Sequence, residues 1–250
     1  ECLHAATLVH DDIVDGADYR RGRDSVHLVW SQAAAVLSGD FLFAAAADLV
    51  AGLGRPRIVR MFADTIMKMC RSEFGAPELT DAPKKRLENY FSKIEGKTAS
   101  LFALCCEASA ELADAGEPAR AAMRGYGTNL GIAFQIADDL LDVVGDESDI
   151  GKPAGNDLRQ GLLTLPVIYF LNNGSAEGSL VHRVIDQSAG EEIEVRQATG
   201  EIRDSGAIEH ALADAELFAE RARRFAAELP IGASRAALED LTYYVIHRLS

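Results

Sequence analysis

The chain has 250 residues, of which 48% are hydrophobic and 26% are charged, a composition typical of a globular protein with a sizeable buried core. Its formal net charge of −14 argues against nucleic acid or an anionic membrane as the main partner, because like charges repel. A protein this acidic needs local cations to bind an anion, supplied by metal ions or by clustered basic residues.

Nearly the whole chain is predicted to be helical, because Ala, Leu, Glu, Arg and Ile dominate and apolar residues recur at intervals of three and four. No alternating run of β-branched residues is long enough for a sheet. The simplest interpretation is one all-α domain over residues 1–250. In chain order, helices are expected at residues 1–16, 25–52, 56–75, 82–114, 117–144, 162–173, 177–188, 190–204, 206–228 and 232–249.

One irregular stretch, residues 145–161, is rich in Gly, Asp and Lys. It directly follows a helix that carries carboxylates, so it is a candidate functional loop.

Other features bear on the cellular setting. The most apolar stretch, residues 33–53, carries Asp40 and Asp48, so no membrane-spanning segment and no stable membrane insertion are predicted. The four cysteines lack zinc-ligand spacing, which favours a reduced, cytoplasmic setting. The chain opens without Met and already in a helical pattern, so we expect that N-terminal helices are lacking.

The most informative feature is a pair of D-D-x-x-D motifs. Residues three and four apart share one face of a helix, so each motif gathers its carboxylates on one side. Like charges on one face repel each other unless cations neutralise them. The motifs comprise Asp11, Asp12 and Asp15 in the first copy and Asp138, Asp139 and Asp142 in the second.

Oxygen-only ligands without His or Cys suit a hard cation. Mg²⁺ typically takes one or two carboxylates and completes its coordination with water and substrate phosphate. A solvated acidic helix face is the alternative interpretation. The apolar sequence around both motifs argues against it, because buried carboxylates need a metal or basic partner. Two such clusters facing each other would hold several Mg²⁺ ions and a diphosphate.

Basic residues follow each motif, as a diphosphate site requires. Arg20 and Arg21 come just after the first motif, and Lys152 comes after the second. The planar guanidinium of arginine suits diphosphate oxygens. A third basic site, residues 96–98 (Gly-Lys-Thr), is not a P-loop, because no G-x-x-x-x-G precedes it and it lies inside a helical pattern.

Five segments of the chain form a recognisable set: residues 4–15 (HAATLVHDDIVD), 20–22 (RRG), 96–98 (GKT), 134–142 (FQIADDLLD) and 151–157 (GKPAGND). In sequence and in order they closely resemble the motifs of the trans-isoprenyl (polyprenyl) diphosphate synthases, in particular the medium- and long-chain members. The likeness runs from residue 1 to about residue 166.

The resemblance implies an isoprenoid synthase-type all-α bundle, with the aspartate motifs on facing helices above a deep central cavity, and a homodimer. It implies a prenyltransferase that adds isopentenyl diphosphate head-to-tail to an allylic diphosphate. The steps would be ionisation, condensation and elimination, with Mg²⁺ as the cofactor, about three ions per active site.

The resemblance also assigns roles, position by position. The metal ligands would be Asp11, Asp15, Asp138, Asp139 and Asp142. The catalytic set would be Asp11, Asp12, Asp15, Asp138, Asp139 and Lys97, with Asp12 in a supporting role. The allylic diphosphate would be held by Arg20, Lys97, Thr98 and Gln135. Isopentenyl diphosphate would contact His4 and Arg21, and Lys152 would help to close the site.

Two departures from the family pattern stand out. The family's upstream G-G-K-R-x-R-P segment, whose Lys and Arg bind isopentenyl diphosphate, does not occur in the chain. In residues 161–166 (GLLTLP), Leu162 replaces a family Lys, which puts one contact to the allylic diphosphate in doubt.

Product length in this family depends on residues just before the first motif, where a bulky aromatic stops growth early. Ala6 and Thr7 occupy these positions and are small. We therefore expect a product longer than C15.

Three alternative functions fit the sequence less well. A class I terpene cyclase would carry N-D-x-x-S-x-x-x-E, which is absent, and a head-to-head squalene or phytoene synthase would use D-x-x-x-D rather than adjacent aspartates. A catalytically silent subunit of a heteromeric synthase usually loses its aspartates, whereas all six are present here.

Overall fold

The computed structural model describes residues 1–20, 22–145, 155–173, 179–187 and 192–247. These residues are almost entirely helical, with one two-stranded pairing, which confirms the predicted all-α class. The chain falls into two compact units, Glu1–Ala63 and Asp64–Ser250, and the division lies inside α4 (Pro56–Ser72). That the two units form one domain stays a prediction.

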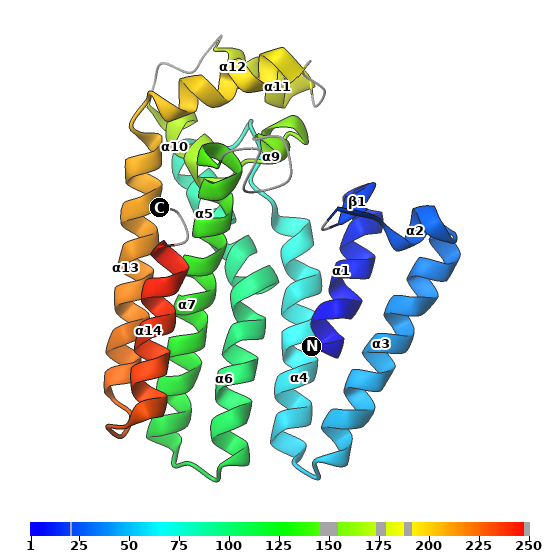
Figure 1. The fold of residues 1–250 in the computed structure, drawn as a ribbon, viewed down its shortest axis with the longest axis vertical. Helices are drawn as coiled ribbons and strands as arrows, with labels where there is room; N and C mark the ends of the chain where they lie inside the picture. The colour runs from blue at the N-terminus through cyan, green and yellow to red at the C-terminus, as the bar shows by residue number, and fades with distance from the viewer. Residues whose placement is uncertain (21, 146–154, 174–178, 188–191, 248–250) are drawn as a thin grey trace. The chain divides into compact units, whose positions relative to one another are not determined.

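In the first unit, α1 (Cys2–Val14) packs along α3 (Gln32–Gly52), as Figure 1 shows. The helices approach closely where Gly39 meets His10, because a Cβ at position 39 would lie 2.1 Å from His10 Nε2. The same nitrogen lies 3.1 Å from the carbonyl oxygen of Val36. His10 is thus a packing residue between two helices.

The predicted helix over residues 25–52 is interrupted. α2 (Val26–Val29) ends at Trp30, and the following Ser31 has an extended backbone. The Ser31 Oγ accepts a hydrogen bond from the N–H of Ala34 at 3.1 Å, so Ser31 caps a new helix.

A short antiparallel pairing of β1 (Tyr19–Arg20) with β2 (Arg23–Asp24) follows α1. Two residues per strand are too few for an alternating pattern to be recognised in a sequence, so it was not expected. The turn contains Gly22, whose φ of +74° is one that glycine adopts readily.

By length and composition, α3 could cross a membrane, contrary to the expectation drawn from Asp40 and Asp48; it is the single such helix among the described residues. The same length and composition also suit a packed helix of a globular protein. In this structure Ala35, Gly39 and Ala46 of α3 are buried.

The central element of the second unit is α7 (Glu117–Val144). In Figure 1 it is flanked by α6 (Ser100–Leu112) and α13 (Ala207–Ala227), and α14 (Ala233–His247) also packs on it. Small residues permit these contacts. A Cβ at Gly131 would lie 2.6 Å from the Cα of Ala99, and α13 fully buries Ala211, Ala215, Ala219, Ala222 and Ala226.

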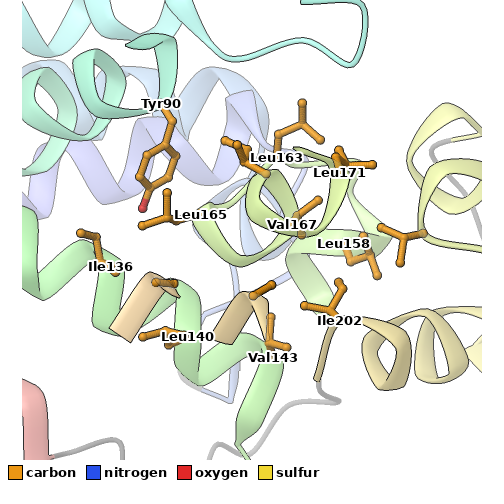
Figure 2. Packing of buried hydrophobic residues seen from close by; sticks show 14 of the residues in the cluster. Tyr90, Ile136, Leu140, Val143, Leu158, Leu163, Leu165, Val167, Leu171 and Ile202 are labelled. Carbon is orange, nitrogen blue, oxygen red and sulfur yellow. The ribbon is translucent and has the colours of Figure 1, made fainter. Parts of the chain in front are cut away.

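The main apolar core of this unit gathers α7, α5 (Pro83–Ile94) and α10 (Leu165–Asn172). Figure 2 shows its centre, with the Tyr90 ring beside Leu165 and with Ile136 and Leu140 on α7. These four side chains are at most 3% exposed. The Tyr90 hydroxyl therefore lies among mainly aliphatic side chains.

The predicted helix over residues 82–114 contains a π-helical turn, η2 (Glu95–Ala99), between α5 and α6. Gly96 in this turn packs on the end of α4, since a Cβ there would lie 2.7 Å from the Cβ of Ser72. π turns carry an extra residue and often occur at functional sites. This one contains Lys97 and Thr98.

The remaining described elements are η1 (Glu73–Gly75), α9 (Asn156–Arg159), α11 (Leu180–Gln187) and α12 (Glu192–Arg203). The single turn of α9 falls in the stretch 145–161 that was expected to be irregular. Residues 146–154 of that stretch lie outside the described residues.

Candidate active site

The first aspartate cluster lies in the last turn of α1. Asp12 is 4% exposed, and its Oδ1 accepts a hydrogen bond from Arg20 Nε at 2.5 Å. The turn between α1 and β1 brings Arg20 back over the helix end. Asp11 is half-buried and Asp15 is exposed. In this cluster, therefore, Asp12 is paired with arginine, while Asp15 is open to solvent for a cation.

This arrangement bears on the predicted roles. Asp12 forms an ion pair with Arg20, and its expected supporting role in metal binding stays a prediction. Arg20, expected to hold the allylic diphosphate, is bound to Asp12, and Arg21 lies outside the described residues.

Upstream on α1, His4 is exposed and its carbonyl oxygen accepts a hydrogen bond from Thr7 Oγ1 at 2.8 Å. Ala6 is fully buried and Thr7 is half-buried. Ala6 therefore has no room for a larger side chain without displacing its neighbours, whereas Thr7 has some. The roles of His4 in substrate binding and of Ala6 and Thr7 in chain length stay predictions.

The second aspartate cluster lies near the C-terminal end of α7. Asp138 is exposed, whereas Asp139 is 4% exposed. The Oδ2 of Asp139 accepts a hydrogen bond from the Tyr90 hydroxyl at 2.6 Å, and its Oδ1 accepts one from Gln135 Nε2 at 2.9 Å. Among the described residues, Asp139 has no ion pair with Lys or Arg. It is a buried carboxylate held by neutral donors.

Burial raises the pKa of Asp139 to about 6, because removal from water disfavours the ionised form. The hydrogen bonds from Tyr90 and Gln135 lower this pKa, while the charge of Asp138 raises it. Burial and the adjacent Asp139 carboxylate also raise the pKa of Tyr90 well above its ordinary value, so Tyr90 stays a hydrogen-bond donor. A cation bound here would favour the ionised carboxylate.

The third aspartate of this motif, Asp142, holds the chain beyond α7. Its Oδ1 accepts from the N–H of Asn156 at 3.1 Å, and its Oδ2 accepts from the N–H of Asp157 at 3.0 Å. Its carbonyl oxygen accepts from the N–H of Gly155 at 2.8 Å. Asp142 thus caps α9, a role that the sequence did not reveal, and its metal role stays a prediction.

The π turn joins the second cluster through Thr98. Its Oγ1 donates to Gln135 Oε1 at 2.7 Å, which links Thr98, Gln135, Asp139 and Tyr90 in one chain of hydrogen bonds. The predicted Thr98 and Gln135 are therefore in direct contact. Their roles toward a diphosphate stay predictions.

Lys97, in the same turn, lies 2.9 Å from Glu73 Oε1. Lys152, expected to help close the site, lies outside the described residues. Leu162, which stands where the family has Lys, is partly exposed. Its N–H donates to the carbonyl oxygen of Asp157 at 2.9 Å, so the backbone there is fixed beside α9.

Sequence reasoning missed Tyr90 and Glu73. Tyr90 lies 49 residues from Asp139 in the sequence. Its only signal was a tyrosine in a largely polar helix, seven residues before Lys97. Glu73 carried no signal that distinguished it from other surface acids.

The donor set fits a hard divalent cation. Mg²⁺ usually binds one or two carboxylates and fills its shell with water and phosphate oxygens, so a complete protein cage is not required. The described residues contain no group of three or more His, Cys, Asp or Glu side chains arranged to hold a metal. Asp15 and Asp138 are exposed, and Asp139 offers oxygens with neutral partners alone.

Residues 1–202 match the polyprenyl synthetase family. The chain belongs to this family. It is 36% identical over 248 residues to heptaprenyl diphosphate synthase component 2 of Geobacillus stearothermophilus, which covers 98% of this chain and 76% of that protein. It is also 36% identical over 251 residues to an all-trans-nonaprenyl-diphosphate synthase of Rhodobacter capsulatus, covering 100% of this chain and 76% of that enzyme.

Solved structures of polyprenyl synthases share the fold. A decaprenyl diphosphate synthase from Rhodobacter capsulatus has a TM-score of 0.90 at 35% identity, covering 100% of this chain and 77% of that one. A polyprenyl synthase from Caulobacter crescentus, complexed with calcium and isoprenyl diphosphate, has a TM-score of 0.92 at 36% identity, covering 100% and 76%. The predicted family and its isoprenoid synthase fold are confirmed.

Proposed function

We propose that this protein is a trans-polyprenyl diphosphate synthase, which condenses isopentenyl diphosphate onto an allylic diphosphate and releases a product longer than C15. The observation that carries the proposal is the second aspartate cluster. There, in a member of the polyprenyl synthetase family, a buried Asp139 with neutral partners lies beside an exposed Asp138.

The carboxylates of Asp11, Asp15, Asp138 and Asp139 are proposed to hold Mg²⁺, about three ions per active site. Mg²⁺ bound there supplies positive charge that stabilises the departing diphosphate. Support comes from the calcium and isoprenyl diphosphate in the Caulobacter crescentus structure, because calcium and magnesium both prefer oxygen ligands.

The chain's own side chains orient the allylic diphosphate in this proposal. Gln135, held by the Thr98 hydroxyl, offers its second amide N–H to the diphosphate oxygens, and Thr98 can donate to them once its hydroxyl turns from Gln135 Oε1. Lys97 supplies a positive charge once the diphosphate competes with Glu73 for its ammonium. Arg20 fixes Asp12 and adds a guanidinium beside the first cluster.

The reaction requires stabilisation of the diphosphate charge and exclusion of water from the site. The allylic C–O bond breaks as the diphosphate leaves, the isopentenyl double bond attacks the allylic cation, and loss of a proton restores a double bond. The departing diphosphate can accept that proton, so no side-chain base is required. Apolar surroundings are needed to keep water from the cation.

The assembly and location belong to the same proposal. We propose a homodimer that works in the cytoplasm without inserting into a membrane. The four cysteines all lie in the described part of the chain and none is in a disulfide, which is compatible with a reducing compartment. The relative named component 2 raises the alternative of a second, different subunit. Light scattering of the purified protein, alone and at several concentrations, measures its molar mass and so distinguishes a homodimer from a monomer that needs a different subunit.

The test is turnover by the full-length protein with labelled isopentenyl diphosphate, an allylic diphosphate and Mg²⁺. Labelled lipid longer than C15 is expected. The matched pair of variants is Asp138→Ala, which should abolish labelling, and Asp240→Ala, an exposed aspartate on α14 that should leave it unchanged. Folded protein that transfers no label to lipid, or makes C15 alone, would overturn the proposal.

A further inference from the structure

Tyr90 is the one residue of the hydrogen-bonded chain that no motif of the sequence includes. Its ring is packed in the core between α5 and α10, and it is 3% exposed. Figure 2 shows the ring beside Leu165 with the hydroxyl directed toward α7. The hydroxyl donates to Asp139 Oδ2 at 2.6 Å. A core residue on one helix thus reaches an aspartate of the D-D-x-x-D motif on another.

The donors around Asp139 are all uncharged. They are the Tyr90 hydroxyl and the Gln135 amide. A carboxylate has about four lone-pair positions, so two donors leave about two for a cation. The donors fix the direction of the carboxylate plane but do not neutralise its charge, whereas an arginine partner would.

Because Asp139 is buried, the orientation of its carboxylate depends on hydrogen-bond donors of the protein. A carboxylate at 4% exposure without hydrogen bonds would turn toward solvent or toward the nearest donor. Gln135 shares α7 with Asp139, one turn away, so it moves with the helix. Tyr90 comes from α5 and therefore fixes the carboxylate relative to a second helix.

We infer that Tyr90 is a positioning residue, which holds the Asp139 carboxylate in the orientation that binds a divalent cation. The inference rests on the proposed function, since Asp139 is taken as a metal ligand. Groups that orient a metal ligand typically change metal affinity by 10- to 100-fold when they are removed. A tyrosine that merely filled the core would change stability and leave metal affinity unaltered.

The chain contains a matched control. Tyr126 is a second buried tyrosine, 1% exposed, and it lies on α7 itself. Its hydroxyl donates to the carbonyl oxygen of Leu238 at 2.8 Å, so it reaches no carboxylate. Tyr90→Phe and Tyr126→Phe each remove one buried hydroxyl and keep the ring.

The experiment measures Mn²⁺ binding by electron paramagnetic resonance with full-length protein. An Asp11→Asn/Asp15→Asn background removes the first cluster, so that the second one titrates alone. We expect Tyr90→Phe to weaken Mn²⁺ binding about tenfold and Tyr126→Phe to change it less than twofold. In the parent enzyme with Asp11 and Asp15 intact, Tyr90→Phe should need more Mg²⁺ for half-maximal rate and recover rate at high Mg²⁺. A core defect would not be rescued by metal.

The outcomes separate the two proposals. Parent enzyme that neither binds Mn²⁺ nor makes lipid overturns the proposed function. Active parent enzyme, with equal Mn²⁺ affinity in Tyr90→Phe and Tyr126→Phe, overturns the positioning role alone. If Tyr90→Phe is too unstable for titration, the rise in Tm on adding a fixed Mn²⁺ concentration replaces it; a rise as large as in Tyr126→Phe also overturns the role.

Discussion

Asp142 Oδ2 accepts the backbone N–H of Asp157 at 3.0 Å, while its other oxygen accepts that of Asn156 at 3.1 Å. The last aspartate of the second motif is therefore a helix cap for α9. A carboxylate that serves two N–H groups at a helix start also faces the positive end of the helix dipole. This local role is separable from metal binding.

Asp142→Ala should lower the free energy of unfolding by about 1–3 kcal/mol, because two backbone donors lose their acceptor. Chemical denaturation without metal measures this change. Asp240→Ala, an exposed aspartate on α14, should change it by less than about 0.5 kcal/mol. Equal stability of the two variants would show that the cap contributes nothing.

Thr98→Val should raise KM for the allylic diphosphate several-fold, since Gln135 Oε1 loses its donor and its amide is free to turn. Thr98→Ser keeps the hydroxyl and should behave as the parent enzyme. Steady-state kinetics with saturating isopentenyl diphosphate measure both. A rise in KM of the same size in both variants would contradict the role of this hydrogen bond, because Thr98→Ser keeps the hydroxyl.

Gly131→Ala should destabilise the protein by about 1–3 kcal/mol, because the new Cβ would lie 2.6 Å from the Cα of Ala99, a backbone atom that cannot turn away. Gly200→Ala on α12 is its counterpart, with no atom within 4 Å of the added Cβ. That variant should gain about 0.5–1 kcal/mol from reduced freedom of the unfolded chain. Thermal unfolding of both variants tests the pair.

The stability of the metal-free protein should carry a pH signature of Asp139. Its pKa of about 6 in the folded protein exceeds the ordinary value of 3.8, so between these pH values the folded state holds a proton that the unfolded state has lost. Stability should therefore fall as pH rises through this window, by about 2–3 kcal/mol in total.

Asp139→Asn removes that titration, so the difference in unfolding free energy between parent and variant isolates it. The parent should lose stability relative to Asp139→Asn from pH 4 to pH 6. A difference that is flat across this window would contradict the raised pKa.

Thr7→Phe should shorten the product, because a large ring at a half-buried position enters the space into which the chain is proposed to grow. Ala6→Phe is expected to cost stability instead, about 1–3 kcal/mol, since Ala6 is fully buried. Thin-layer analysis of labelled lipids and a melting curve separate the two effects. Unchanged product length in Thr7→Phe would remove this residue from length control.

The sequence predicted the helical class, the family and the two aspartate motifs, because residue spacing along one helix requires no knowledge of tertiary structure. It also placed Thr98 and Gln135 in one site through the family likeness. It did not predict that Asp139 is buried while Asp138, its neighbour, is exposed. That distinction depends on how α7 is rotated against α5 and α10.

The missed contacts share a physical cause. Tyr90 to Asp139 and Lys97 to Glu73 each join residues on different elements, and only packing brings them together. The π turn at Glu95–Ala99 was missed because its one extra residue leaves the apolar periodicity nearly unchanged. The break at Ser31 was missed because its cap interrupts an apolar run without Gly or Pro.

The geometry of the candidate site also depends on the number of residues in the π turn. The π turn absorbs its extra residue within one turn, so deleting Glu95 would convert it to α-helix and change the directions in which Lys97 and Thr98 project. The hydrogen bond from Thr98 to Gln135 would then be lost while every motif stayed intact. A sequence with this deletion would still contain both aspartate motifs and the Gly-Lys-Thr segment, but the site that they form would be altered.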